Sequence, residues 1–363
     1  MSLTQNLSRG ILRSPAVAAL TSPHGVDRYL EIVNPMWAVN EVRARVVGVH
    51  QETGDVTTLT LHPTSTWRGF RAGQKVLLGV EIDGARRTRC FSISSAQTST
   101  AENEGRDDFT ITVRAHDEGL VSKHLAHRAE PGLVVHLSQA EGEFTLPANL
   151  PDRLLMISGG SGITPLMSML RTLVENGYDG RVTFLHYSQS PEQTIFADEL
   201  VEIAEGQDNI DLAVVHTRHG GARFSEERLK TLAPDYAAID TFACGPVGLI
   251  EQVQEIYKDS NRLKVEYFKT STISADPNDA TGNVLFATSQ KQAENTGGTL
   301  LEQAEALGLA PAFGCRMGIC FTCTSRKTEG TIRNVVTGAE SSLPDEDIQI
   351  CVSTPVGDCA VAL

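Results

Sequence analysis

The sequence predicts a multidomain protein made of an antiparallel β-barrel, an α/β domain with a parallel sheet, and a small α+β domain. Three observations support this prediction. The chain has 363 residues, more than the roughly 250–300 residues at which single hydrophobic cores stop growing. Its texture changes from short Val-, Thr- and Ile-rich runs to alternating strand and helix patterns. A polar, apolar-poor stretch then separates the C-terminal part from the rest.

Composition excludes several classes of protein. Hydrophobic residues make up 40% of the chain and charged residues 21%, which is typical of an ordinary globular protein. No apolar run approaches the ~18 residues of a membrane span. A formal net charge of −14 disfavours nonspecific nucleic-acid binding, which needs a basic surface. The charge favours basic protein partners, and a merely soluble acidic surface explains it equally well. The N-terminus lacks a convincing signal peptide, so we expect a cytoplasmic protein.

The first 150 residues read as an extension followed by a β domain. Pro15, Pro23 and Pro35 interrupt any long helix in residues 1–40, so we expect an N-terminal extension with one short helix. Short strands separated by Gly- and Asp-containing turns are typical of an antiparallel barrel or sandwich, which we assign to residues 41–150. The expected strands are Arg45–Val49, Thr57–Leu61, Lys75–Ile82, Thr88–Ser94, Thr110–Arg114 and Val134–Leu137.

Residues 151–268 alternate strands and helices, which predicts a parallel sheet covered on both faces. The expected strands are Leu154–Ser158, Val182–Tyr187, Leu212–Thr217 and Thr241–Cys244. The expected helices are the one that begins near Thr164, then Phe196–Ala204, Glu226–Leu232 and Val247–Lys258. We expect Thr164 to cap the first helix, with Pro165 in its first turn.

The segment 269–282 is rich in Ser, Thr, Asp and Asn, and we interpret it as an interdomain linker. A linker that lets the last domain move and one that joins domains across a fixed interface fit this composition equally well. The final domain, 283–363, is expected to contain a strand at Asn283–Thr288 and a helix at Thr299–Leu307. A cysteine-rich loop follows the helix, and two short strands are expected to close the chain.

Four of the seven cysteines form a recognisable ligand pattern. Cys315, Cys320 and Cys323 follow the spacing Cys-x4-Cys-x2-Cys, and Cys351 follows after 27 intervening residues. This is the plant-type ferredoxin spacing for a [2Fe–2S] cluster, which needs four thiolates. The alternatives are unrelated buried cysteines or a zinc site, which usually needs a second Cys-x2-Cys pair that is absent here. We therefore predict a [2Fe–2S] ferredoxin domain with the β-grasp fold, with Cys359 left as a core cysteine.

The barrel region carries landmarks of flavin binding. They are Ala72-Gly-Gln, Arg89-Cys-Phe-Ser92, Gly119-Leu-Val-Ser122 and Gly142-Glu-Phe. In this order the four segments resemble the flavin domain of the ferredoxin–NADP reductase superfamily, and the resemblance extends over residues 42–268. It implies FAD as the cofactor; FMN, which some members of the superfamily bind, is the alternative.

The resemblance also implies roles for individual residues. Arg89 would neutralise the flavin pyrophosphate, because a guanidinium is planar and permanently charged; a surface salt bridge is the alternative reading. Phe91 would stack on the flavin ring, and Ser92 would hydrogen-bond near flavin N5. Val121 and Ser122 would open a helix whose N-terminal amides hold phosphate. Val113 completes the expected flavin-binding set.

Residues 159–165 read GGSGITP between an apolar strand and a helix, which predicts a phosphate-binding turn. The expected contacts are Gly160, Gly162 and Thr164. The turn also matches the nicotinamide-domain loop of the superfamily, as does Ala243-Cys-Gly-Pro246 at the end of a later strand. The cofactor-binding set therefore includes Cys244, Gly245 and Pro246. The family places this cysteine beside nicotinamide C4, so Cys244 would shape hydride transfer; a buried bystander is the alternative.

The segment Glu266-Tyr-Phe268 matches the Glu-x-Phe that often ends this domain, where the aromatic ring can cover the flavin. The implied catalytic set is therefore Ser92, Cys244, Glu266 and Phe268, although Phe268 also fits ordinary core packing. Arg218 and Arg223 follow the third parallel strand and are candidates for an adenosine 2′-phosphate. They favour NADPH over NADH as the electron donor. If Arg218 is instead an ordinary solvated surface residue, it does not indicate which nucleotide binds.

The order of flavin, nicotinamide and ferredoxin regions resembles single-chain reductase components of oxygenases, hydroxylases and fatty-acid desaturases. It implies an NAD(P)H-dependent oxidoreductase that sends electrons through FAD and the cluster to such a partner protein. Two other functions stay open: a self-contained diaphorase, quinone reductase or ferric reductase, and an electron-transfer subunit that does not oxidise nicotinamide. The cluster disfavours the first, and the intact nicotinamide motifs disfavour the second.

Overall fold

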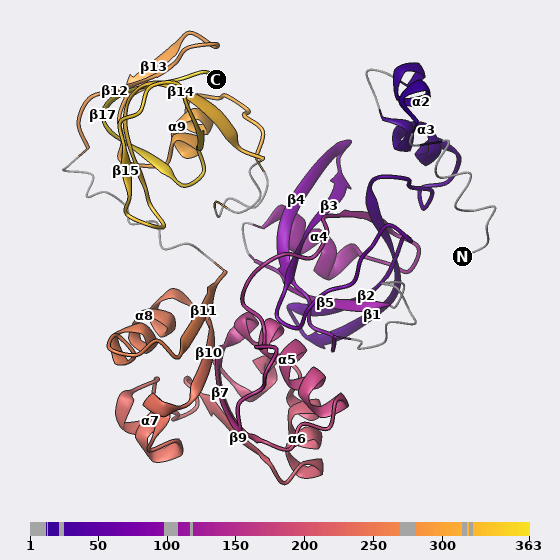
Figure 1. Cartoon of the computed structure of the whole chain (residues 1–363), viewed down its shortest axis with the longest axis vertical. Helices are drawn as coiled ribbons and strands as arrows, with labels where there is room; N and C mark the ends of the chain where they lie inside the picture. The colour runs from indigo at the N-terminus through magenta and orange to yellow at the C-terminus, as the bar shows by residue number, and fades with distance from the viewer. Residues whose placement is uncertain are drawn as a thin grey trace. The chain divides into compact units, whose positions relative to one another are not determined.

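The computed structural model describes residues 12, 14–21, 25–97, 108–116, 119–268, 280–313, 318 and 322–363. The chain divides into two compact units, Met1–Phe268 and Lys269–Leu363. The first unit contains an antiparallel and a parallel sheet, and the second contains a mixed sheet with one helix (Figure 1). This architecture confirms the predicted fold class. Within the described residues, no helix is long and apolar enough to cross a lipid bilayer.

The antiparallel sheet is a six-stranded barrel with the strand order β4-β3-β6-β1-β2-β5. The two edge strands of this sheet are β4 and β5. An antiparallel bridge between Ile93, directly after β4, and Ile111, in β5, joins these edges and closes the barrel. The helix α4 (Leu120–Arg128) packs against the barrel and contributes Val121 and Leu125 to its core. The strands are β1 (Val42–Thr53), β2 (Val56–Pro63), β3 (Lys75–Ile82), β4 (Ala85–Ser92), β5 (Phe109–Arg114) and β6 (Val134–Leu137).

In the described part of the N-terminal segment, the helices α2 (Pro15–Leu20) and α3 (Val26–Val33) precede the barrel, where one short helix was expected. A buried polar network holds α3 in place. The carboxylate of Asp27 accepts hydrogen bonds from the backbone amides of residues 39, 40 and 41. The fully buried guanidinium of Arg43 donates to the carbonyl oxygens of Asp27 and Pro35 and pairs with Glu31 and Glu41. Charged residues therefore hold this segment in place.

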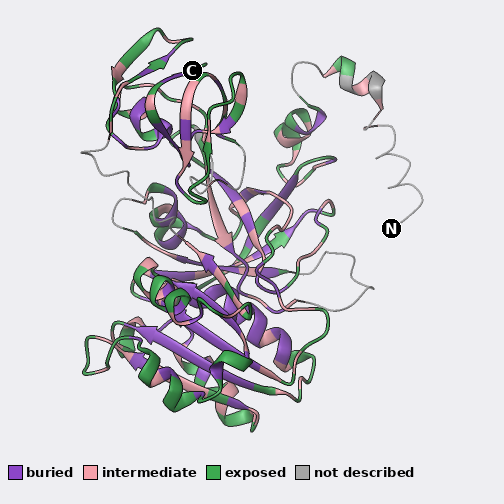
Figure 2. Cartoon of the chain, turned by 60° about the vertical axis from the view of Figure 1, so that its left-hand side comes forward, coloured by how far each residue is buried: buried purple, intermediate pink, exposed green. Residues whose placement is uncertain are grey.

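The parallel sheet has the strand order β11-β10-β7-β8-β9. Its central strands are buried on both faces, as the purple strands in Figure 2 show, which explains their continuous apolar runs. The strands are β7 (Arg153–Gly159), β8 (Arg181–Ser188), β9 (Ile210–His216), β10 (Asp240–Gly245) and β11 (Leu263–Tyr267). The helices are α5 (Ile163–Glu175), α6 (Ala197–Gly206), α7 (Glu226–Leu232) and α8 (Val247–Ile256).

Two local expectations for this sheet were wrong. The N-cap of α5 is Gly162, and Thr164 lies inside the first turn, where its hydroxyl donates to the carbonyl oxygen of Ser161 at 3.0 Å. A 3₁₀ turn at Gly160–Gly162 begins the helical geometry early, so no side chain caps the helix. The edge strand β11 was not expected, because its sequence alternates apolar and charged residues and is only half-buried.

The second unit contains a mixed sheet and the helix α9 (Leu300–Ala306). A capping box between Thr299 and Glu302 begins this helix. The expectation of two closing strands was wrong, because four strands follow the cysteine-rich loop, and β13 was missed as well. Most of these strands are polar and partly exposed, so their sequences do not show the alternation of apolar and polar residues that predicts a strand. The strands are β12 (Asn283–Phe286), β13 (Lys291–Glu294), β14 (Thr324–Asn334), β15 (Glu340–Ser341), β16 (Glu346–Gln349) and β17 (Ser353–Val361).

Candidate functional site

Strand β4 carries the expected flavin residues at its end. Phe91 is partly buried and packs against the barrel core, and Arg89 is half-buried with one guanidinium nitrogen donating to the carbonyl oxygen of Thr88. The Ser92 side chain is buried, and its hydroxyl oxygen has no hydrogen-bond partner among the described residues. Because buried hydroxyls are nearly always hydrogen-bonded, this oxygen is available for a bound group.

The other expected flavin residues lie where β5 meets α4. Val113 and Val121 are fully buried in the barrel core, so their side chains are committed to packing. The Ser122 hydroxyl accepts a hydrogen bond from the His116 amide and donates to the Gly119 carbonyl oxygen, both at 3.2 Å. Ser122 therefore closes the loop before α4 with its side chain, which leaves its backbone amide in the first turn of a nine-residue helix.

The turn after β7 packs against the end of β10 without room for side chains. A Cβ on Gly162 would lie 2.3 Å from the carbonyl oxygen of Cys244, and one on Gly245 would lie 3.0 Å from the Gly159 amide nitrogen. Gly160 has a φ of +53°, and a Cβ there would lie 3.2 Å from a guanidinium nitrogen of Arg114. These glycines therefore bring the two nicotinamide motifs into direct backbone contact.

Three expected catalytic residues are joined through one that the sequence analysis missed. Cys244 and Glu266 are register partners on β10 and β11. The Glu266 carboxylate accepts a hydrogen bond from Lys75 Nζ at 2.7 Å, and Lys75 is the register partner of Ser92 on β3 and β4. Lys75 carries no motif of its own, since only the folded chain brings residues 75 and 266 together.

Burial is the largest influence on the pKa values of Cys244 and Glu266. It raises the pKa of the Cys244 thiol well above its usual range, with a further contribution from Glu266, so the thiol stays neutral. It also raises the pKa of Glu266, which Lys75 opposes. The Lys75 pKa is raised overall, because its pairing with Glu266 and its interactions with Cys90 and Glu141 outweigh desolvation. A neutral thiol is suited to shaping the site and unsuited to nucleophilic attack.

Phe268 is the last described residue of the first unit. It is partly buried and packs against the apolar cluster that contains Cys244, Phe144 and Phe242. Its ring therefore lies beside the predicted hydride-transfer residues, and it also contributes to core packing there.

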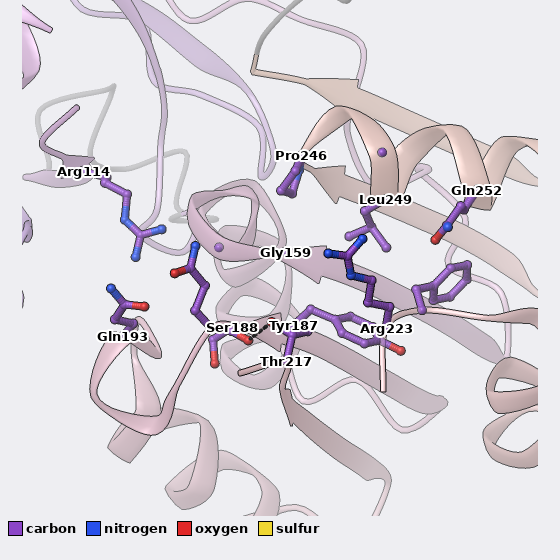
Figure 3. Close-up of a pocket in the computed structure, with 14 residues that line it drawn as sticks. Arg114, Gly159, Tyr187, Ser188, Gln193, Thr217, Arg223, Pro246, Leu249 and Gln252 are labelled. Carbon is purple, nitrogen blue, oxygen red and sulfur yellow. Dashed lines mark hydrogen bonds between the residues drawn. The ribbon is translucent and has the colours of Figure 1, made fainter. Parts of the chain in front are cut away.

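A cavity of about 400 Å³ opens at the carboxyl ends of the parallel strands. Figure 3 shows Arg114 and Arg223 on opposite sides of it, with Ser188 between them. Pro246, which caps α8, also lines the cavity. Arg218 is exposed and does not line it, which weakens the prediction for that residue. The full lining is Arg114, Gly159, Gly160, Tyr187, Ser188, Gln189, Gln193, Thr217, Arg223, Phe224, Pro246, Gly248, Leu249 and Gln252.

Arg114 is a second residue that the sequence analysis missed as a site residue. It ends β5 of the barrel and reaches the turn after β7, where its Nε lies 3.1 Å from a carboxylate oxygen of Asp55. Its side chain is 18% exposed, so this cation is largely desolvated beside the cavity. A basic residue at the end of a strand with many threonines gives no local signal that it will meet a distant loop.

In the second unit, Cys323 and Cys351 are buried next to each other. A hydrogen bond from Cys351 and nearby backbone amides lower the pKa of Cys323 to about 6. This environment favours the thiolate form that iron requires. Cys315 and Cys320 lie outside the described residues, so their predicted role as ligands stays a prediction.

Two family models match the chain. Residues 156–255 match the oxidoreductase NAD-binding domain, and residues 286–356 match the 2Fe-2S iron-sulfur cluster binding domain. An NADPH oxidoreductase of Mycobacterium tuberculosis is 36% identical over 349 residues, which cover 95% of this chain and 90% of the relative. The chain belongs to the ferredoxin–NADP reductase family, with a C-terminal [2Fe–2S] ferredoxin domain.

Other proteins resemble this reductase over most of its length. A glycine betaine monooxygenase reductase subunit of Chromohalobacter salexigens is 30% identical, covering 91% of this chain and 97% of that one. The solved structure of phthalate dioxygenase reductase has a TM-score of 0.61 at 21% identity and covers 88% of this chain and 97% of that one, which shows a shared fold. The reductase is an oxidoreductase that uses NAD(P)H, FAD and a [2Fe–2S] cluster.

The residues present fit these groups. The buried, unpartnered hydroxyl of Ser92 offers a donor to a flavin, and the second carboxylate oxygen of Glu266 is buried without a partner among the described residues. The cavity with a basic residue on each side fits a dinucleotide that carries several phosphates. The adjacent thiols of Cys323 and Cys351 fit two of the four cluster ligands.

Proposed function

We propose that this reductase takes electrons from NADPH and delivers them, through FAD and the [2Fe–2S] cluster, to a protein oxygenase. The observation that carries the proposal is the junction of Ser92, Lys75, Glu266 and Cys244, which joins the flavin barrel to the nicotinamide sheet. The relatives support the acceptor class, because one is named as a monooxygenase reductase subunit. The relatives described above include no desaturase, so we favour an oxygenase over a desaturase.

The proposed roles follow from the positions of the residues. Ser92 donates its free hydroxyl near flavin N5, Phe91 provides the ring that faces the flavin, and Arg89 neutralises the pyrophosphate. Cys244 stays a neutral thiol and sets the approach of the nicotinamide ring. Phe268 covers the flavin side of the junction until nicotinamide arrives. Bound FAD supplies the conversion from a two-electron donor to a one-electron cluster.

We infer that two arginines divide the recognition of the dinucleotide. Arg114, beside the Gly160 turn, binds the pyrophosphate, while Gly162 and Gly245 keep the backbone close. Arg223 lies on the opposite side of the cavity and binds the adenosine 2′-phosphate, which NADH lacks (Figure 3). The name of the Mycobacterium tuberculosis relative supports NADPH as the donor. NADH remains a weaker donor in this proposal, since the pyrophosphate contact is shared.

The proposed domains are an N-terminal extension (1–40), an FAD-binding barrel (41–150), an NAD(P)-binding domain (151–268), a linker (269–282) and the ferredoxin domain (283–363). The division of the chain between Phe268 and Lys269 supports the boundary between the NAD(P)-binding domain and the linker. We propose Cys315, Cys320, Cys323 and Cys351 as the cluster ligands, and a cytoplasmic location where thiols stay reduced.

Anaerobic titration of the purified protein with NADPH, and separately with NADH, tests the proposal through the visible spectrum. We expect NADPH to bleach both the flavin and the iron–sulfur bands at lower concentration than NADH. Flavin bleaching without cluster reduction would favour a diaphorase, and no bleaching by either nucleotide would favour a non-catalytic electron-transfer subunit. Either of these two results would overturn the proposal.

A further inference from the structure

Lys75 forms a buried ion pair at the junction of the two sheets in the first unit. Its Nζ lies 2.7 Å from Oε1 of Glu266, and the two side chains are only 12% and 6% exposed. The residues are 191 positions apart in the chain and belong to different sheets. A buried ion pair is costly to desolvate and contributes little net stability on average, so its position needs another explanation.

The pair connects the two residues that flank the proposed hydride-transfer position. On the barrel side, Lys75 is the register partner of Ser92. On the nicotinamide side, Glu266 is the register partner of Cys244. The ion pair therefore links the strand pair that carries the flavin contact to the strand pair that carries the nicotinamide contact. A shift in either side chain would change the geometry between those two contacts.

Hydrogen-bonding capacity is left unused around this pair. Oε1 of Glu266 is occupied by Lys75, but Oε2 is buried and has no partner among the described residues. The hydroxyl oxygen of Ser92 and Oε1 of Glu141 are also buried and have no hydrogen-bond partner among the described residues. Unpartnered buried polar atoms are rare in proteins, and three that gather around one lysine indicate a position completed by a ligand.

We propose that Lys75 is a positioning residue for flavin reduction, which holds Glu266 ionised and oriented so that its free oxygen accepts a hydrogen bond where nicotinamide meets the flavin. This inference rests on the proposed function. Lys75 acts through Glu266 and does not itself touch the reacting atoms. It explains why a lysine occupies this largely buried position at the start of β3, on the face opposite the barrel core.

The charges near the pair define its pH dependence. The titratable groups that face it are Cys90 on β4, Glu141 after β6, and Cys244 on β10. Burial raises the pKa of Glu266, and Lys75 opposes that rise. Without Lys75, the carboxyl group loses its nearby positive charge and takes up a proton at higher pH. The Cys244 thiol stays neutral in both cases, because burial dominates its pKa.

The test is rapid-mixing measurement of flavin reduction by saturating NADPH in Lys75→Met and Lys75→Arg, across neutral and alkaline pH. We expect Lys75→Met to slow reduction by about tenfold or more at neutral pH, because the acceptor is protonated and displaced. The rate should recover as pH rises and the carboxyl group ionises. Lys75→Arg should retain most of the rate, and the dissociation constant of NADPH should change little in either variant.

The matched control is Lys264→Met. Lys264 lies two residues from Glu266 on β11, and its Nζ donates to the carbonyl oxygen of Thr145, outside the ion pair. We expect it to keep the wild-type rate and pH profile. Equal slowing in Lys75→Met and Lys264→Met, or a wild-type profile in Lys75→Met, would overturn the proposal. If Lys75→Met does not fold, the double variant Lys75→Met with Glu266→Gln, which removes both charges of the ion pair, is measured in its place.

Infrared spectroscopy of the holoprotein provides a readout that does not depend on turnover. We expect the carbonyl band of a protonated carboxylic acid to appear in Lys75→Met at neutral pH. It should be absent from the wild type and from the variant that also carries Glu266→Gln. If wild-type flavin is not reduced by NADPH, the proposed function fails while this band still decides the role of Lys75. Absence of the band in Lys75→Met would show that Lys75 does not keep Glu266 ionised.

Discussion

Arg223 is the residue on which we expect the preference for NADPH over NADH to depend. It lines the cavity, whereas Arg218, five positions earlier, is exposed outside it. Arg223→Ala should raise the KM for NADPH by roughly tenfold or more, because it removes a charge-assisted hydrogen bond to phosphate. The KM for NADH should change by less than about twofold, since NADH has no 2′-phosphate. Steady-state kinetics with a ferricyanide acceptor measure both values.

Arg218→Ala is the control for this prediction, since it removes the same charge from the same loop. It should leave both KM values near those of the wild type. A larger effect on NADPH from Arg218→Ala than from Arg223→Ala would assign the 2′-phosphate to Arg218, as the sequence alone allowed.

The residues of the site were predictable only where a motif is local. Ser92, Cys244 and Glu266 belong to short segments that match landmarks of the ferredoxin–NADP reductase family, and that resemblance implied their roles. Lys75 and Arg114 were missed, because each acts on a loop or strand more than 40 positions away and carries no motif. Long-range pairing of charges depends on how two sheets pack, and a single sequence does not reveal it.

At the scale of elements, the contact between the turn after β7 and the end of β10 should be intolerant of any side chain. Gly162→Ala places a Cβ 2.3 Å from the Cys244 carbonyl oxygen, and backbone atoms on both sides must move. We expect a loss of about 1–3 kcal/mol in unfolding free energy and weaker NADPH binding. Thermal unfolding and nucleotide titration of the holoprotein measure these two effects.

Gly206→Ala is the matched substitution in the same sheet-and-helix region. Gly206 ends α6, and a Cβ there has no neighbouring atom within 4 Å. Its unfolding free energy should stay within about 0.5 kcal/mol of the wild type, which is usual for surface substitutions. Similar destabilisation in both variants would mean that the glycine contact between β7 and β10 is not a tight one.

A buried histidine on β8 should make the nicotinamide sheet sensitive to acid. Burial, with smaller contributions from His216 and Arg114, lowers the pKa of His186 to about 3, while its Nδ1 lies 2.7 Å from the Ser158 hydroxyl. The unfolded chain binds this proton below about pH 6.5, and the folded chain does not until about pH 3. The unfolded state therefore gains protons first, and stability contributed by neutral His186 falls as pH decreases from 6.5 towards 3.

The corresponding variant is His186→Gln, which removes the titrating ring. Between pH 7 and pH 5 the wild type should lose about 2 kcal/mol more unfolding free energy than this variant. Denaturant unfolding at both pH values measures the difference. Parallel loss of stability in the two proteins would show that His186 does not titrate in this manner.

Elements with a strong apolar period were predictable, and polar edge elements were not. The strands β7 and β8 are almost entirely buried and rich in apolar residues, and their bounds were expected to within two residues. The edge strand β13 contains no large apolar residue and was missed, since its backbone pairing leaves no mark on composition. The helix α3 was not located although its apolar residues recur at helical spacing. The hydrogen bonds of Asp27 and Arg43 that hold it in place cannot be read from the sequence.

At the scale of the whole molecule, the two units should separate two activities. Cys323 in the second unit is a predicted cluster ligand, and its neighbour Cys351 is buried beside it. Cys323→Ser should remove most electron transfer to a one-electron protein acceptor such as cytochrome c, because that route requires the cluster. Oxidation of NADPH by ferricyanide should survive, because ferricyanide takes electrons from the flavin in the first unit.

Cys359→Ser distinguishes cluster loss from damage to the second unit's core. Cys359 is buried on β17, and burial raises the pKa of its thiol to about 11, so it is a neutral core residue. This variant should keep the iron–sulfur absorbance and both activities. If Cys323→Ser lost both activities while it retained its flavin, the first unit could not oxidise NADPH without the cluster. The division of work between the two units would then be wrong, and electron flow would need both units at every step.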